Sequence, residues 1–180
     1  GVYRIFFTGS STAFSSGAPD EAGTISGRLE RLLNDDLAPR TGMRYEVVNA
    51  ANPGWASTHE RIWIEVRLCD LDPDMVIQYS GNNEAHWGVL RYRTHWMRSY
   101  AAHLQWVAHA AFSQAYGDGP PADVAPREAG RVPPERIPPV LNRNVDQARH
   151  LLASRGTAYV FVLHPTLAET RKPLTPREQG

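Results

Sequence analysis

Three short segments rich in glycine and polar residues carry the side chains of this chain that could do chemistry. Ser11 follows the apolar run at residues 2–7, and a serine just past a strand can attack a carbonyl carbon when a base removes its proton. The attack creates an oxyanion, which needs hydrogen-bond donors already aimed at it. We expect these donors to be the backbone N–H groups of Ser11 and Gly54 and the side-chain amide of Asn83.

The residues beside these donors are the candidates for binding a substrate. Trp55 and Trp87 flank the Gly54 and Asn83 segments, and their aromatic faces could hold a sugar ring or an acyl chain. Packing in the core is the alternative role for at least one of the two. Glu84 is expected either to tie the site loops together by hydrogen bonds or to be a solvated carboxylate.

Short apolar runs alternate with segments of helical periodicity along most of the chain, which predicts an α/β fold. The expected strands are residues 2–7, 45–48, 74–79 and 158–163, and the expected helices are residues 25–37, 57–71, 94–116 and 140–154. Ser57 or Thr58 is the expected N-cap of the second helix. Strands that alternate with helices are parallel, so a three-layer α/β/α sandwich follows, with its ligand site at the carboxyl ends of the strands.

The order of the three segments resembles the first three sequence blocks of the SGNH (GDSL-like) hydrolases. The matching residues are Gly9-x-Ser11, then Asn49 to Gly54, then Gly81-x-Asn83-Glu84. The resemblance implies a flavodoxin-like fold, a serine nucleophile, and an oxyanion hole built from the serine amide, the glycine and the asparagine. Ser10 stands where the family name has aspartate, as in the G-x-S-T variants that pair with a G-x-N-E block.

The general base that the resemblance implies is absent from these 180 residues, because the family's late Asp-x-x-His block does not occur in them. We therefore expect the last strand and helix portion, with the catalytic histidine, beyond Gly180. His164 is the alternative base, since the sequence His164-Pro-Thr resembles what often follows that histidine. However, Phe161 stands three residues before it, and residues 159–163 are expected to form a buried strand.

Composition limits the domain organisation and the partners. One domain is expected for 180 residues that are 42% hydrophobic. Residues 117–139 hold half of the fourteen prolines and are expected to be a loop insertion, either a surface excursion or a lid. Nineteen basic residues balance nineteen acidic ones, which does not favour nucleic acid, and no apolar run approaches the roughly 20 residues of a membrane span.

Metal and cofactor chemistry is not expected. The histidines at 86, 95, 103 and 109 do not have the spacing of a compact ligand set. Cys69, the single cysteine, is expected to be a buried apolar residue. The expected partner is thus a small-molecule or carbohydrate ester.

Two other functions are weighed against the esterase. The first is a non-catalytic SGNH-like module that binds a carbohydrate or a protein. The second is a nucleotide-binding domain, but residues 9–17 contain neither G-x-G-x-x-G nor a P-loop sequence.

Overall fold

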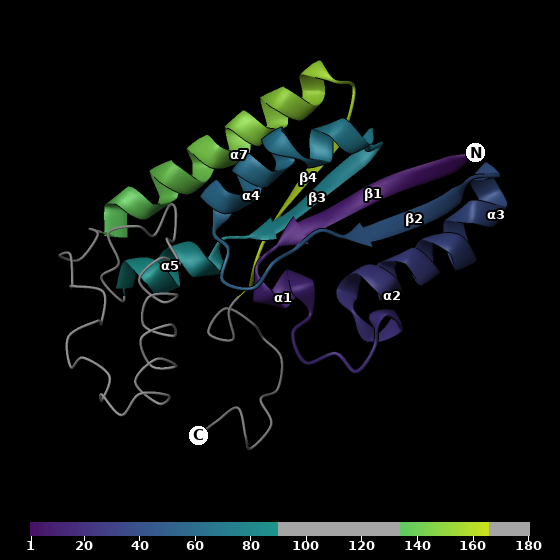
Figure 1. The fold of residues 1–180 in the computed structure, drawn as a ribbon, viewed down its shortest axis with the longest axis horizontal. Coiled ribbons are helices and arrows are strands. Elements are labelled where there is room, and N and C mark those ends of the chain that lie inside the picture. The colour runs from purple at the N-terminus through teal and green to yellow at the C-terminus, as the bar shows by residue number, and fades with distance from the viewer. Residues whose placement is uncertain (90–133, 166–180) are drawn as a thin grey trace, which may run out of the picture.

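The computed structural model of the protein describes residues 1–89 and 134–165 (Figure 1). Four strands form one parallel sheet in the order β2-β1-β3-β4. The strands are β1 (Val2–Gly9), β2 (Arg44–Asn49), β3 (Met75–Ser80) and β4 (Ala158–Leu163). The parallel sheet predicted from the alternating pattern is confirmed, and each observed strand overlaps an expected one.

Helices and helical turns cover both faces of this sheet. In chain order they are α1 (Ser11–Phe14), η1 (Glu21–Gly23), α2 (Ile25–Leu32), η2 (Leu33–Leu37), α3 (Ala38–Thr41), α4 (Ser57–Val66), η3 (Leu68–Leu71), α5 (Asn82–Val89), η4 (Pro134–Arg136) and α7 (Ile137–Ser154). Of the described helices, none is both long enough and apolar enough to cross a bilayer.

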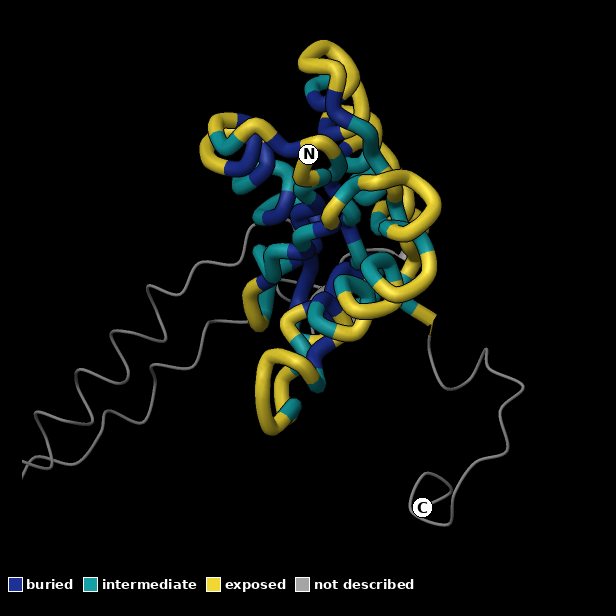
Figure 2. Tube along the Cα trace, turned by 90° about the vertical axis from the view of Figure 1, so that its right-hand side faces the viewer, coloured by how far each residue is buried: buried dark blue, intermediate teal, exposed yellow. Residues whose placement is uncertain are grey.

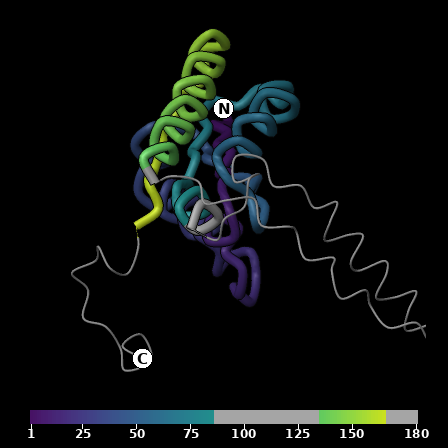
Figure 3. The backbone as a smooth tube through the Cα atoms, turned by 90° about the vertical axis from the view of Figure 1, so that its left-hand side faces the viewer, coloured from purple at the N-terminus to yellow at the C-terminus, as the bar shows by residue number. Residues whose placement is uncertain are grey.

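Two apolar cores separate the sheet from its helix layers, because successive strand residues point to opposite faces. Phe6 of β1 packs on one face with Ile64 of α4 and Leu152 of α7. Ile5 and Phe7 pack on the other face, where α2 and η2 lie. The buried residues accordingly gather in the middle of the molecule (Figure 2), and α4 and α7 lie side by side (Figure 3). The three-layer α/β/α sandwich is confirmed.

The start of α7 and the N-cap of α4 differ from the expectation. Helix α7 begins at Ile137, three residues early, because Pro138 and Pro139 fall in its first turn, where a missing N–H costs no helical hydrogen bond. Helix α4 begins at Ser57, as expected, but Ala56 occupies its N-cap position. The expectation that Ser57 or Thr58 is the N-cap is therefore wrong, because both residues are already helical. The expected helix at residues 94–116 and most of the proline-rich segment, residues 117–133, lie outside the described residues.

The expectation that β4 is a buried strand is wrong. Strand β4 lies at the edge of the described sheet, next to β3 alone. Its side chains Val160, Val162 and Leu163 are 40%, 36% and 61% exposed. Apolar strand composition alone does not separate a central strand from an edge strand, which explains the error.

Candidate active site

The first part of the candidate site is the tight turn between β1 and α1. Ser11 is the first residue of α1 and is half-buried. A Cβ atom on Gly9 would lie 2.3 Å from the carbonyl oxygen of Tyr79 and 2.5 Å from Cβ of Ala13. Only glycine therefore lets β1, β3 and α1 approach this closely. The close approach fixes the position of Ser11 at the carboxyl end of the sheet.

The second part is the loop that follows β2. The backbone N–H of Asn52 donates to the Gly9 carbonyl oxygen at 3.0 Å. The Asn49 side-chain amide donates to the Phe14 carbonyl oxygen at 3.2 Å, at the end of α1. These two bonds attach the loop to the turn that carries Ser11. Gly54 lies further along the same loop with φ of +80°, a conformation that favours glycine.

The third part is the first turn of α5, which follows β3. Asn83 is 9% exposed, and its Nδ2 donates to the carbonyl oxygen of Trp55 at 2.6 Å. A primary amide has two N–H groups, so one remains after this bond. Asn83 thus contacts the loop that carries Gly54.

The three predicted oxyanion donors belong to segments that are joined in this way by hydrogen bonds. The loop after β2 is bonded to the turn of Ser11 on one side and to Asn83 on the other. Among the described residues, the backbone N–H groups of Ser11 and Gly54 have no hydrogen-bond partner. Both groups therefore keep a free donor at the carboxyl edge of the sheet, as an oxyanion site requires.

A cavity of about 480 Å³ opens beside Ser11. Four of its eight lining residues carry a hydroxyl group, and Arg28 of α2 is the charged residue among them. The lining residues are Ser11, Thr12, Ser15, Ser16, Ala18, Gly23, Ile25 and Arg28. The lining surface is more apolar than polar, and its few polar groups could orient a small molecule.

No base is hydrogen-bonded to the Ser11 hydroxyl within residues 1–89 and 134–165. His164, the alternative base, directly follows β4, and its backbone N–H donates to the Ser80 carbonyl oxygen at 2.8 Å. Its ring meets the Tyr79 ring edge-on, with centroids 5.0 Å apart. Its Nδ1 is buried without a partner among the described residues. His164 is therefore a strand-end residue, as its place in the sequence indicates.

Two buried carboxylates lie beneath these segments. Glu84 is 1% exposed, and its Oε1 accepts a hydrogen bond from the backbone N–H of Ser57. Glu84 thus bonds the start of α4, where the loop after β2 ends, and the alternative expectation of a solvated carboxylate is wrong. With so little exposure, Glu84 lies under the site and does not offer its carboxylate to a substrate.

The second carboxylate, Glu60, is one that the sequence reasoning missed. It is fully buried and accepts hydrogen bonds from Gln78 Nε2 at 2.7 Å and from Ser80 Oγ at 2.9 Å. Burial raises its pKa to about 8, the charge of Glu84 adds to the rise, and the bonds from Gln78 and Ser80 oppose it. The available signal was its position four residues before Ile64, on the apolar face of α4.

Of the two tryptophans expected beside the site, the structure describes the side chain of Trp55 only. The Trp55 ring is partly buried, stacks on His59 at a centroid distance of 6.4 Å, and meets Trp63 edge-on at 5.7 Å. Packing against α4, the alternative considered for one tryptophan, is what the structure shows for Trp55. The side chain of Trp87 lies outside the described residues.

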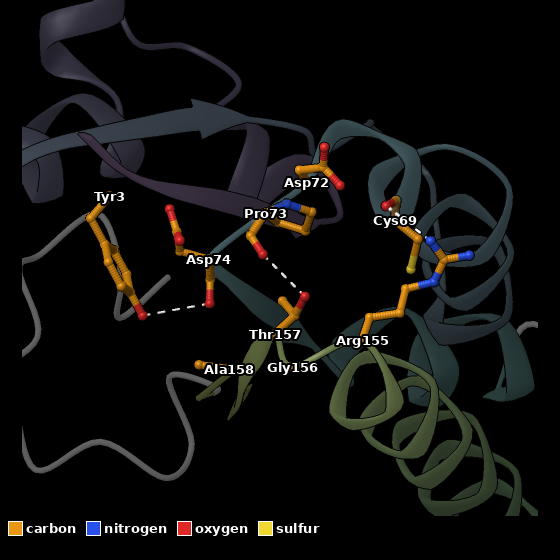
Figure 4. A pocket seen from close by; sticks show the side chains of 9 residues that line it. All are labelled: Tyr3, Cys69, Asp72, Pro73, Asp74, Arg155, Gly156, Thr157 and Ala158. Carbon is orange, nitrogen blue, oxygen red and sulfur yellow. Dashed lines mark hydrogen bonds between the residues drawn. The ribbon is translucent and has the colours of Figure 1, made fainter. Parts of the chain in front are cut away.

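A second cavity, of about 610 Å³, lies at the amino ends of the strands, and Figure 4 shows the residues that line it. Residues that line this cavity bond one another: Thr157 Oγ1 donates to the Pro73 carbonyl oxygen at 3.0 Å, and Arg155 donates to the Cys69 carbonyl oxygen at 3.3 Å. Cys69 itself is a buried free thiol, as expected. Ligands of open α/β sheets bind at the carboxyl ends of the strands, so this amino-end cavity is not the candidate active site.

Comparisons with known proteins return solved structures only, since no protein-family model and no curated protein matches the chain. TesA is 21% identical, with 87% of this chain and 76% of TesA covered and a TM-score of 0.41. A catalytic mutant of Axe2, an acetylxylan esterase from Geobacillus stearothermophilus, is 14% identical, with 87% and 74% covered and a TM-score of 0.43.

A mutant of the esterase AlinE4 is 15% identical, with 99% of this chain and 89% of AlinE4 covered and a TM-score of 0.44. The architecture of this chain is established by its own parallel sheet and two helix layers.

Proposed function

We propose that this chain belongs to the catalytic domain of a serine esterase of the SGNH kind, with Ser11 as the nucleophile. The observation that carries the proposal is the hydrogen-bonded loop after β2, which connects the turn of Ser11 to the side chain of Asn83. Three donors suited to an oxyanion then belong to one bonded unit beside a serine at the carboxyl end of the sheet.

The proposed reaction proceeds in two halves. A base takes the proton of the Ser11 hydroxyl as its oxygen forms a bond to the ester carbonyl carbon. The resulting oxyanion accepts hydrogen bonds from the N–H groups of Ser11 and Gly54 and from Nδ2 of Asn83. The intermediate collapses to acyl-Ser11 and releases the alcohol, which takes up the proton from the base. Water then attacks the acyl group by the same route and frees Ser11.

The proposed substrate is a small O-acyl group on a carbohydrate or a short-chain ester. The cavity beside Ser11 supports this choice, because its volume of about 480 Å³ suits a small molecule and four of its lining residues offer a hydroxyl group to a polar substrate. The Trp55 ring packs against α4, so its role in this proposal is to hold the loop in shape and not to stack on a sugar ring.

A non-catalytic binding module is the second candidate. The observation that favours it is the lack of a base bonded to Ser11 in the described part of the chain. The Asp-x-x-His segment that the SGNH resemblance implies as the source of the general base does not occur in these 180 residues. A binding module would hold a carbohydrate in the same cavity without turning it over.

The test is turnover of p-nitrophenyl acetate by the full-length protein and by Ser11→Ala. The substitution removes the nucleophile without disturbing a buried contact, so we expect hydrolysis to fall to background while the unfolding midpoint changes little. Ser154→Ala, at the far end of α7, is the control for loss of a serine hydroxyl and should keep wild-type turnover. Unchanged turnover in Ser11→Ala would refute the assignment.

A further inference from the structure

The backbone donor of Gly54 belongs to a loop, and a loop must be held still if it is to act in an oxyanion hole. Two consecutive side chains of α5 form hydrogen bonds to the backbone of the segment that follows Gly54. Asn83 Nδ2 donates to the Trp55 carbonyl oxygen at 2.6 Å, and Glu84 Oε1 accepts from the Ser57 N–H. We call this pair of bonds the loop clamp. It joins one proposed donor, Asn83, to the chain that carries the other, Gly54.

The Glu84 half of the clamp also supplies a missing helix cap. Ala56 occupies the N-cap position of α4 and has no side-chain acceptor to offer. The carboxylate of Glu84 replaces such a cap from another element, and its negative charge is favourable beside the amino end of a helix. Because Glu84 is 1% exposed, water does not compete for this bond.

Neighbouring buried side chains keep the same helix end in place. Asn144 of α7 is 2% exposed, and its Nδ2 lies 2.9 Å from Ser57 Oγ and 2.8 Å from Thr58 Oγ1, to which it donates. Glu60, one turn into α4, accepts from Gln78 and Ser80 at the end of β3. The amino end of α4 is therefore bonded to β3, α5 and α7 at once. A network of buried hydrogen bonds of this kind is rigid, so it can fix the loop that carries Gly54 at a constant distance from Asn83.

We propose that Glu84 is a positioning residue that fixes the Gly54 N–H relative to the Asn83 amide through its bond to Ser57. This inference rests on the proposed esterase function. Glu84 does not touch the substrate; it acts by holding the segment at residues 54–57 against α5. Loss of its bond lets that segment shift, and a displacement of about 1 Å at a reacting group can cost on the order of 100-fold in rate.

The experiment compares kcat and KM for p-nitrophenyl acetate in the full-length protein and in Glu84→Ala, Glu84→Gln and Ser57→Pro. Glu84→Ala should lower kcat by about 10- to 100-fold with a much smaller change in KM. Glu84→Gln keeps an oxygen acceptor for Ser57 and should restore most of kcat. Ser57→Pro removes the N–H itself at the first position of a helix, where proline is tolerated. It should lose more kcat than Ser57→Ala, which loses only the hydroxyl that Asn144 bonds, even if Glu84→Ala folds poorly.

The matched control is Glu30→Ala. Glu30 Oε2 accepts from the Val47 N–H at 2.8 Å, so this variant also loses a bond between a carboxylate and a backbone N–H, but on the other face of the sheet. It should lower the unfolding midpoint and leave kcat near wild type. The proposal is overturned if Glu84→Ala and Ser57→Pro lose no more kcat than Glu30→Ala. Wild-type turnover that survives Ser11→Ala instead refutes the proposed function, and the role of Glu84 with it.

Discussion

At the scale of single residues, Asn83 has two tasks for one amide group. One N–H holds the Trp55 carbonyl oxygen at 2.6 Å, and the other is left for the proposed oxyanion. An asparagine suits both tasks because it donates two hydrogen bonds without bringing a charge. The low exposure of Asn83, 9%, keeps its amide in one orientation and strengthens its electrostatic effect.

We predict that Asn83→Ala lowers kcat by about 10²-fold, the usual effect of removing one oxyanion donor. The measurement is steady-state hydrolysis of p-nitrophenyl acetate. Asn34→Ala is the control, since Asn34 Nδ2 donates to the Tyr45 carbonyl oxygen at 2.8 Å on the other face of the sheet. Equal kcat in the two variants would remove Asn83 from the oxyanion hole.

Glu60 should make stability depend on pH. Burial, with the Glu84 charge adding to it, raises the pKa of Glu60 from 4.5 to about 8. The unfolded chain therefore ionises Glu60 at lower pH than the folded chain does, and the contribution of the protonated form to stability, full below pH 4.5, is lost as pH rises to about 8. We expect the free energy of unfolding to fall by a few kcal/mol across this range.

The measurement is urea unfolding at several pH values for wild type and Glu60→Gln. Glutamine is neutral at every pH and can still bond Gln78 and Ser80, so this variant should show a flatter profile and gain stability relative to wild type at pH 8. Parallel pH profiles in the two proteins would show that Glu60 ionises in its ordinary range.

At the scale of elements, the turn from β1 into α1 positions the nucleophile. Gly9 has φ of +154° and no room for a Cβ atom between Tyr79 and Ala13. Helix α1 is only one turn long and ends at Phe14, and the next residue, Ser15, adopts a left-handed conformation. The direction of Ser11 is thus set by close backbone packing more than by the intrinsic preference of a four-residue helix.

We predict that Gly9→Ala destabilises the protein by about 1 to 3 kcal/mol through overpacking and lowers kcat by moving α1. Thermal unfolding and ester hydrolysis measure the two effects. Gly42→Ala is the control: Gly42 has φ of +66°, but a Cβ atom there would meet nothing within 4 Å. It should lower stability through backbone strain alone and keep wild-type kcat. A Gly9→Ala variant with normal kcat would show that α1 tolerates displacement.

At the scale of the whole molecule, the alternation of apolar runs and helical segments was sufficient to predict the parallel sheet and its two helix layers. The edge position of β4 was not predictable, because its apolar residues would suit a central strand equally well. The buried polar side chains around the amino end of α4 were not predictable for a different reason. Glu60 and Asn144 lie on helices at positions that only the packing of α4 against β3 and α7 brings together.

The sequence was sufficient to predict which segments form the candidate site, but not what each neighbouring side chain does there. Ser11, Gly54 and Asn83 follow three strands in order, and this order alone predicts that they lie at the carboxyl end of the sheet. The bond from Glu84 to Ser57 could not be predicted from the sequence, since the sequence does not show whether the Glu84 carboxylate is buried or solvated. The packing of Trp55 on His59 and Trp63 likewise depends on the loop conformation.

The most direct test of the esterase account is covalent labelling of Ser11 by a fluorophosphonate, located by peptide mass spectrometry of the full-length protein. A phosphonate forms its adduct only with an activated nucleophile and resembles the tetrahedral intermediate. The account predicts one adduct, on the peptide that contains Ser11, and its loss in Ser11→Ala. An unlabelled Ser11 in folded protein, or an adduct that persists in Ser11→Ala, would contradict it.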